Sequence, residues 1–313
     1  MTELKYSWFP GCSAGSTGIA YTQSAKYVAD KIGLEMKEID DWCCCGTSAA
    51  RITDDDLMHA LPARSLALSE RQYPGLDVVA PCTGCYSALK GAQHWARQSE
   101  ENRKHVSELI DMDYAAKADV KSLLEIMVEP DVVDLTVSRL QKTLGGMKIA
   151  CYYGCTQVRP AEVCNFDDVE NPTSMERLLD ACGAECVEWG FKTECCGASF
   201  GIPERPMTAV NSGRILEVAS NMGVDAIAVA CPLCQMNLDL RQKQASKAVN
   251  VFFNMPVLYY TQLMGLAFGF DPRELGLHKL CVSADPLLQK LDGLRREEAL
   301  AEAKAKAAEG GNA

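Results

Sequence analysis

Ten of the sixteen cysteines in this 313-residue chain belong to one pattern that occurs twice. Each copy has a single cysteine, then an adjacent pair followed by glycine, then two cysteines separated by two residues. The positions are Cys12, Cys44, Cys45, Cys82 and Cys85 in the first copy and Cys155, Cys195, Cys196, Cys231 and Cys234 in the second. Counterparts lie 143, 151, 151, 149 and 149 residues apart, in that order. We call each set of five a cysteine ladder, and the nearly constant register predicts that a whole domain is duplicated.

Thiols at these spacings predict a metal centre. Residues 1–5 show no secretory signal, so we expect a cytoplasmic protein whose thiols stay reduced rather than a disulfide scaffold. Neighbouring side chains point apart, so an adjacent pair suits a cluster of several irons better than one tetrahedral zinc ion. An ordinary cubane cluster needs four thiolates, so with five either one is spare or the cluster is of another type. Zinc in one copy remains an alternative, since soft thiolates bind both metals.

The residues beside the ladders favour a negatively charged cluster. Each Cys-x-x-Cys motif lies between an expected strand and the start of an expected helix, where backbone N–H groups and the helix dipole favour anions. Gly11, Gly46, Gly154 and Gly197 stand next to ladder cysteines. Glycine permits the positive φ or the close backbone approach that a bulky cluster requires.

Six further cysteines have no counterpart in the other copy. They are Cys43, Cys151, Cys164, Cys182, Cys186 and Cys281. We expect most of them to be small buried residues. Cys43 differs, because it extends the first pair to three consecutive cysteines and could replace Cys44 as a ligand. The ligand set of the first copy is therefore open at this position.

Periodicity and turn signals predict an α/β fold with two pseudo-symmetric domains. Strands are expected at 6–9, 34–39, 76–80, 148–153, 185–189 and 225–230, and helices at 17–32, 57–71, 86–97, 173–181, 206–222 and 235–244. This alternation indicates a small parallel sheet flanked by helices in each domain. The expected divisions are 1–98 for the first domain, 99–146 for a helical connection, 147–290 for the second domain and 291–313 for a charged, alanine-rich tail.

The net charge and the hydropathy of the chain restrict the kinds of partner that it could bind. A formal net charge of −11 argues against nucleic acid, which requires a surplus of Lys and Arg. Residues 251–270 carry no charge, but the part of this segment after Pro256 is too short to cross a bilayer. We interpret the segment as a buried helix opened by Pro256, with no direct membrane insertion. The sequence contains no glycine-rich nucleotide-binding motif.

On the basis of the two ladders and the residues beside them, the chain resembles the B subunit of heterodisulfide reductase. The CCG domains of that family carry a Cys, a Cys-Cys-Gly and a Cys-x-x-Cys in this order. The similarity covers nearly the whole chain. It includes the flanking segments 9–12, 80–86, 152–160, 193–197 and 256–262.

The resemblance implies a ligand set, a reaction and partners. Cys12, Cys44, Cys45, Cys82 and Cys85 would hold one noncubane [4Fe–4S] cluster, and Cys155, Cys195, Cys196, Cys231 and Cys234 a second. Both clusters would face one disulfide and cleave it with two electrons, without a protein acid or base. Electrons would come from the cubane-cluster C subunit, which the flavin-containing A subunit would supply. The substrate would be the mixed disulfide of coenzymes M and B, or a related sulfur compound as in complexes of sulfur-metabolising bacteria.

A second hypothesis belongs to another functional class. The chain could be a non-catalytic relay that binds clusters or zinc in a sulfur-oxidising, quinone-linked or hydroxyacid-oxidising complex. Two complete ladders favour the enzyme, because ordinary cubane motifs would serve a relay.

Overall fold

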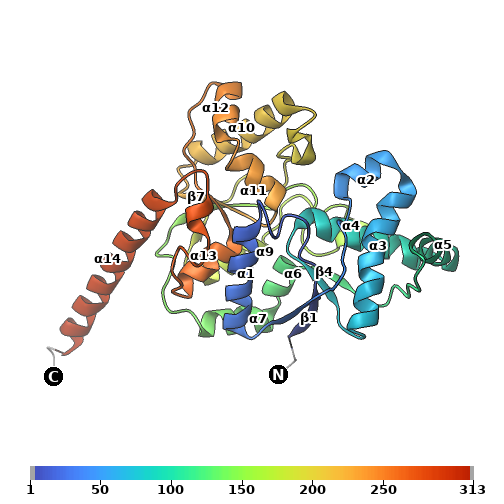
Figure 1. Cartoon of the computed structure of the whole chain (residues 1–313). Coiled ribbons are helices and arrows are strands. Elements are labelled where there is room, and N and C mark those ends of the chain that lie inside the picture. The colour runs from blue at the N-terminus through green and yellow to red at the C-terminus, as the bar shows by residue number, and fades with distance from the viewer. Residues whose placement is uncertain (1–3, 311–313) are drawn as a thin grey trace.

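The protein consists of two α/β halves built on the same plan (Figure 1). The computed structural model describes residues 4–310, without the side chains of Ser48 and of residues 302–310. The first half contains β1 (Lys5–Trp8), β2 (Glu35–Glu38), β3 (Val78–Ala80) and β4 (Val120–Ser122). The second contains β5 (Lys148–Tyr152), β6 (Glu185–Cys186), β7 (Ala226–Val229) and β8 (Val257–Tyr259).

Both sheets are parallel and have the same strand order. It is β2-β1-β3-β4 in the first sheet and β6-β5-β7-β8 in the second. The central strands β3 and β7 are fully buried, as expected for parallel strands covered on both faces. The shared order confirms the expected α/β fold with two parallel sheets.

Helices cover the faces of both sheets (Figure 1). In the first half they are α1 (Ile19–Ile32), α2 (Thr47–Thr53), α3 (Asp55–Gln72), α4 (Thr83–Gln98), α5 (Glu100–Ile110), α6 (Leu123–Met127) and α7 (Pro130–Ser138). In the second they are α8 (Ala161–Cys164), α9 (Ser174–Ala181), α10 (Arg205–Asn221), α11 (Pro232–Leu238), α12 (Gln242–Val249), α13 (Tyr260–Ala267) and α14 (Asp285–Gly310), with short 3₁₀ turns η1 (Ala198–Gly201) and η2 (Leu277–Lys279).

Two segments differ from the sequence prediction. Residues 99–146, expected to be helical, also supply β4, whose Val120 and Ser122 are buried against β3. The prediction that Pro256 opens a helix is wrong, because Val257–Tyr259 form strand β8 and the helix α13 begins at Tyr260. A short apolar run that is buried on all sides does not distinguish strand from helix by periodicity, which explains the difference at β8.

The two halves pack through pseudo-equivalent contacts. α1 of the first half contacts α13 of the second, where the hydroxyls of Ser24 and Thr261 are 2.7 Å apart. On the opposite side α6 contacts α9, and nearby Gln157 Nε2 donates to Ser122 Oγ over 2.8 Å. The halves therefore meet with the carboxyl ends of both sheets near a common centre.

The C-terminal region forms helix α14, which extends away from the body (Figure 1). The predicted tail 291–313 falls in this helix up to Gly310, and residues 311–313 lie outside the described part of the chain. Within residues 4–310, none of the helices has the length and apolar character needed to span a membrane.

Candidate metal centre

The fold places both ladders at the carboxyl ends of parallel strands. Cys12 follows β1, the pair Cys44 and Cys45 follows β2, and Cys82 and Cys85 lie where β3 passes into α4. The second ladder repeats this placement after β5, β6 and β7. In an open parallel sheet, loops diverge at the carboxyl edge where the strand order reverses, and ligands bind in the crevice between them.

In the first ladder the sulfurs of Cys45 and Cys85 are 3.4 Å apart. Gly11 lies directly against them with φ 77°, and a Cβ there would come within 2.9 Å of Cys85 Sγ. Glycine is thus required at this position both for conformation and for space. Hydrogen bonds from Cys44 and Cys85 lower the pKa of the Cys45 thiol to about 4.

The second ladder has the same construction. The sulfurs of Cys196 and Cys234 are 3.5 Å apart, and Gly154 with φ 71° lies against Cys234 as Gly11 does against Cys85. Ala198 N–H donates to Cys196 Sγ over 3.3 Å, and Asn237 Nδ2 donates to it over 3.5 Å. A hydrogen bond from Cys155 lowers the pKa of Cys195 to about 6.

The two ladders meet at equivalent cysteines. The pKa of Cys82 is raised because its thiol is hydrogen-bonded to Cys231, its counterpart in the other copy. Hydrogen bonds from Cys234 and Cys82 lower the pKa of Cys231. All sixteen cysteines are free thiols. The two ladders therefore influence each other's ionisation through Cys82 and Cys231, one from each half.

The donor set fits a polynuclear cluster. Each copy offers five sulfurs and a glycine whose missing side chain leaves room beside a buried thiol, and in the second copy the backbone N–H groups of Gly197 and Ala198 donate to sulfur. Within residues 4–310, no group of three or more His, Cys, Asp or Glu is placed to hold a single metal ion. The ten-cysteine ligand set remains a prediction, and these residues would hold the two clusters.

The cysteines outside the ladders lie away from this centre. Cys43 Sγ donates to the carbonyl of Leu61 over 3.3 Å, so it faces α3 rather than the ladder sulfurs. Cys151, Cys164 and Cys182 are buried, as expected. The remaining two are less buried, since Cys186 is half-buried and Cys281 is exposed.

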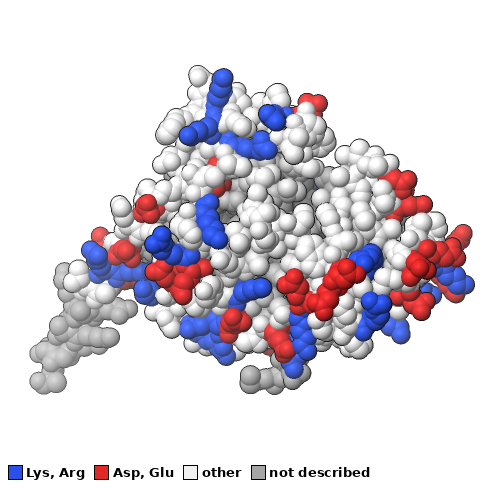
Figure 2. All heavy atoms as spheres, viewed as in Figure 1, with Lys and Arg blue, Asp and Glu red and all other residues white. Residues whose placement is uncertain are grey.

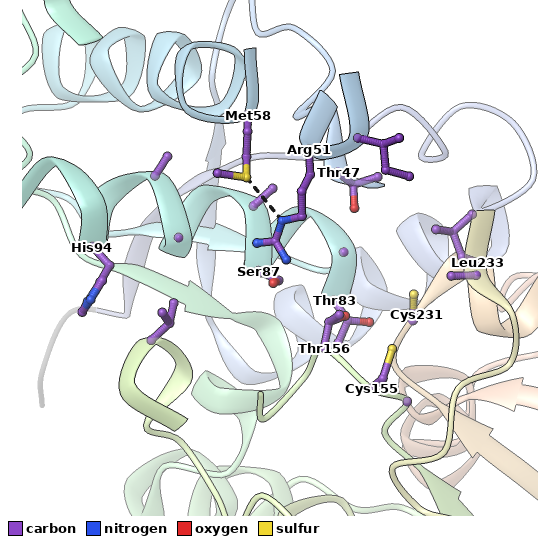
Figure 3. Close-up of a pocket in the computed structure, with 18 of the residues that line it drawn as sticks. Thr47, Arg51, Met58, Thr83, Ser87, His94, Cys155, Thr156, Cys231 and Leu233 are labelled. Atoms are coloured by element: carbon purple, nitrogen blue, oxygen red, sulfur yellow. Dashed lines mark hydrogen bonds between the residues drawn. The ribbon is translucent and has the colours of Figure 1, made fainter. Parts of the chain in front are cut away.

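A cavity of about 370 Å³ leads from the cysteines along one face of α4 (Figure 3). Cys155 and Cys231 lie at one end beside Thr83. The lining α4 residues Gly84, Ala88, Gly91 and Ala92 are small, which leaves the groove open.

The outer part of the cavity carries charge and aromatic surface. Arg51 of α2 extends toward α4 and its Nε donates to Met58 Sδ over 3.3 Å (Figure 3). The rings of His59 and Trp95 stack with their centroids 4.1 Å apart, and His94 lines the same space. None of the four histidines stands in a recognisable sequence motif. No motif connects these positions, and only the packing of α2, α3 and α4 brings them together.

The space-filling view shows where this site opens (Figure 2). Lys and Arg side chains gather on the lobe of α10 and α12 above the hollow, whereas acidic and basic side chains mix over the lower part of the visible face and on its right edge. The side of the hollow formed by the lobe of α2 is mostly uncharged in this view.

Comparison with known proteins matches the CCG family, described as the cysteine-rich domain, at residues 6–90 and 149–239. The chain belongs to this family. Each matched region contains one complete ladder, so the two CCG domains correspond to the two halves of the fold.

Relatives of similar length carry two different descriptions. The chain is 31% identical over 91% of its length to the 8-methylmenaquinol:fumarate reductase membrane anchor subunit of Wolinella succinogenes, of which the match covers 99%. It is 30% identical over 92% of its length to the B subunit of the ferredoxin/F420H2-dependent CoB-CoM heterodisulfide reductase of Methanosarcina acetivorans, of which 97% is covered. The expected resemblance to the heterodisulfide reductase B subunit is confirmed.

One solved structure has the same fold at low sequence identity. A hypothetical protein from Helicobacter pylori superposes with a TM-score of 0.70 over 90% of this chain, at 13% identity. The chain spans about half of that protein, 53% of its length. This likeness concerns the fold alone.

Proposed function

We propose that this CCG protein is the iron–sulfur subunit of a multisubunit oxidoreductase and cleaves or forms a disulfide between two noncubane [4Fe–4S] clusters. The observation that carries the proposal is that both Cys-x-x-Cys motifs reach one end of a cavity, which Thr83 and Gly84 of the first motif and Cys231 and Cys234 of the second line. Two centres separated only by such a junction could act on the same S–S bond.

The reaction is balanced by two electrons and two protons for each disulfide converted to two thiols. Clusters bound to the ladders would supply or accept those electrons. The chain itself shields the junction from water, since Cys82, Cys85, Cys231 and Cys234 are all buried. Removing water strengthens electrostatic and hydrogen-bonding interactions at the reacting sulfurs.

The groove along α4 is the proposed substrate path. Between Gly84 and Gly91 the helix rises by about 10 Å, enough for one arm of a small organic disulfide. Arg51 is exposed and its Nε donates to Met58 Sδ rather than to a carboxylate, so its guanidinium is available for an anionic group on that arm. We therefore expect negatively charged disulfides to be preferred over neutral or cationic ones.

Partners follow from the proposed chemistry. Electrons must enter from outside, so we expect the same complex to contain one protein with a cubane cluster and another with a flavin. The exposed ladder thiols Cys12, Cys44 and Cys195 mark the side from which a donor could approach. Relatives named as heterodisulfide reductase subunits support membership of such a complex.

A second candidate is an electron relay in a quinol-linked complex. The Wolinella succinogenes relative favours it, because that protein is a subunit of a methylmenaquinol:fumarate reductase. In this role the clusters would pass electrons to partner proteins and the groove would bind no substrate.

Disulfide-dependent oxidation of a reduced viologen by the anaerobically purified holoprotein separates the two candidates. We expect turnover with the anionic dithiodipropionate and slower turnover with the neutral bis(hydroxyethyl) disulfide and the cationic cystamine. Added thiol should also produce a new paramagnetic signal in the oxidised protein. A fully loaded protein that neither turns over any of the three disulfides nor responds to thiol would favour the relay.

A further inference from the structure

Near the junction of the two ladders, Tyr259 has a polar group whose hydrogen-bonding capacity is unused. The side chain of Tyr259 is fully buried, and its hydroxyl has no hydrogen-bond partner. A buried hydroxyl without an acceptor is costly, and native proteins rarely leave one unpaired. An acceptor that the protein binds would remove this cost.

The position of Tyr259 in the sheet places it beside the second ladder. Tyr259 ends β8 and pairs in register with Val229 of β7, two residues before Cys231. The pKa of Tyr259 is raised by burial and then by Cys231 and Cys82. These two sulfurs, one from each ladder, are thus the ionisable groups that influence its hydroxyl most.

The ring of Tyr259 is held in place by the first half of the protein. It stacks on Tyr21 of α1 with centroids 4.3 Å apart and planes inclined by 8°. Tyr21 lies in α1, which follows Cys12 in the first half. The stack therefore fixes the orientation of the phenol relative to both halves. A ring fixed in this way directs its hydroxyl with little freedom.

The corresponding position of the first half is built differently. Ser122 ends β4 as Tyr259 ends β8, in register with Ala80 of β3. Its hydroxyl is already occupied, because it accepts hydrogen bonds from Glu125 N and Gln157 Nε2. Of these two strand-end hydroxyls, Tyr259 is therefore the one without any hydrogen-bond partner.

We propose that the Tyr259 hydroxyl donates a hydrogen bond to a sulfur atom bound at the junction of Cys82 and Cys231. The acceptor is either a sulfide of the cluster held by the second ladder or the sulfur of a bound thiol. The inference rests on the proposed clusters, and it makes Tyr259 a positioning residue that sets the electronic properties of the centre. Hydrogen bonds to sulfur stabilise the more negative, reduced state and raise its reduction potential.

The test compares the holoprotein with Tyr259→Phe, which removes only the hydroxyl oxygen. Potentiometric titration followed by EPR is expected to show a lower reduction potential in the variant, with unchanged iron and sulfide content. A shift in the thiol-free protein identifies a cluster sulfide as acceptor. A shift seen only after addition of mercaptopropionate identifies the thiol sulfur.

Tyr114→Phe is the matched control. Tyr114 is also buried with an unpaired hydroxyl, but the charged groups that act on it are Glu70 and Arg97 rather than ladder cysteines. Its variant should titrate like the wild type. Should Tyr259→Phe retain the wild-type potential with and without thiol, or should Tyr114→Phe shift equally, the assignment is overturned.

The outcomes also distinguish this inference from the proposed function. A shifted potential in a protein that turns over no disulfide keeps the role of Tyr259 and removes the disulfide reaction. If the potentials are unchanged in a protein that reduces disulfides, the role of Tyr259 is removed and the disulfide reaction is kept. A purified protein with zinc in place of iron would overturn both.

Discussion

The two CCG domains share their sulfur geometry and differ in what surrounds it. The equivalent sulfur pairs Cys45–Cys85 and Cys196–Cys234 are separated by 3.4 and 3.5 Å, and a glycine with positive φ lies against each pair. The long groove runs along α4 of the first domain, and the ladder cysteines that line it, Cys155, Cys196, Cys231 and Cys234, all belong to the second domain. Duplication has thus preserved the part that would hold metal, while the part that would meet substrate has diverged.

Helix length and side-chain size explain the difference. α4 has 16 residues and presents Gly84 and Gly91 to the cavity. Its counterpart α11 has seven residues, and Leu233 occupies the place of Gly84. A short helix with a bulky residue in its first turn cannot form an equivalent groove. Substrate would therefore approach along α4 of the first domain and reach the sulfurs of the second.

The largest expected effect is loss of one cluster from one domain. Cys196→Ala should abolish the second cluster and leave the first, so that iron content falls to roughly half of the wild-type value, and Cys45→Ala should do the converse. Cys281→Ala is the control, because this exposed cysteine lies outside the ladders. Iron analysis of the three variants measures the effect. Equal iron in all three would show that the ladders are not the ligands.

Obstructing the groove should impair turnover without affecting the metal. Gly91 has open space around it, so Leu fits the helix there but projects into the cavity. Gly91→Leu is expected to raise the KM for dithiodipropionate by about tenfold or more, since overfilling a site costs about 1–3 kcal/mol.

Gly293→Leu provides the matched control for the groove. Gly293 is also a helical glycine with open space, but it lies in α14 away from the cavity. Its variant should keep the wild-type KM. An unchanged KM in Gly91→Leu would mean that substrate does not follow α4.

Neutralising Arg51 should remove the expected preference for negatively charged disulfides. The KM of Arg51→Gln for dithiodipropionate should rise by about tenfold, whereas that for bis(hydroxyethyl) disulfide should stay near wild type, because only the anion loses a charge-assisted hydrogen bond. Arg71→Gln has the same change in charge at the far end of α3 and serves as control. A parallel loss for both disulfides would assign Arg51 a structural role.

The smallest effect is expected at the third cysteine of the first domain. Cys43 bonds to the carbonyl of Leu61, so Cys43→Ala should retain both clusters and lower the free energy of unfolding by about 1 kcal/mol. Iron content and denaturant unfolding measure the two quantities. Loss of iron from this variant would make Cys43 a ligand and end the equivalence of the two ladders.

The sequence predicted the repeated fold because its signals are local. Strand, cysteine turn and helix follow one another within a few residues, and the same order recurs in the second half. β8 was mistaken for a helix because Val257–Tyr259 is buried on all sides and carries no alternation. β4 was missed because its pairing with β3 depends on a partner some forty residues away.

The candidate site was only partly predictable from the sequence, because local spacing reveals the cysteines but not the side chains that packing brings to them. Spacing identified the ten ladder cysteines as a group, and their placement at strand ends follows from the α/β order. Arg51 and His59 belong to no motif, and the segment 256–262 that shares in the family resemblance does not single out Tyr259. Packing alone shows that Arg51 and His59 line one cavity and that Tyr259 ends β8 beside the strand that leads to Cys231.

The central claim is that ten sulfurs, five from each CCG domain, hold two four-iron clusters. Iron, zinc and acid-labile sulfide analysis of the anaerobically purified chain tests it most directly. The account predicts about eight irons and about eight sulfides per chain, without stoichiometric zinc. One or two zinc ions per chain with no labile sulfide would contradict it.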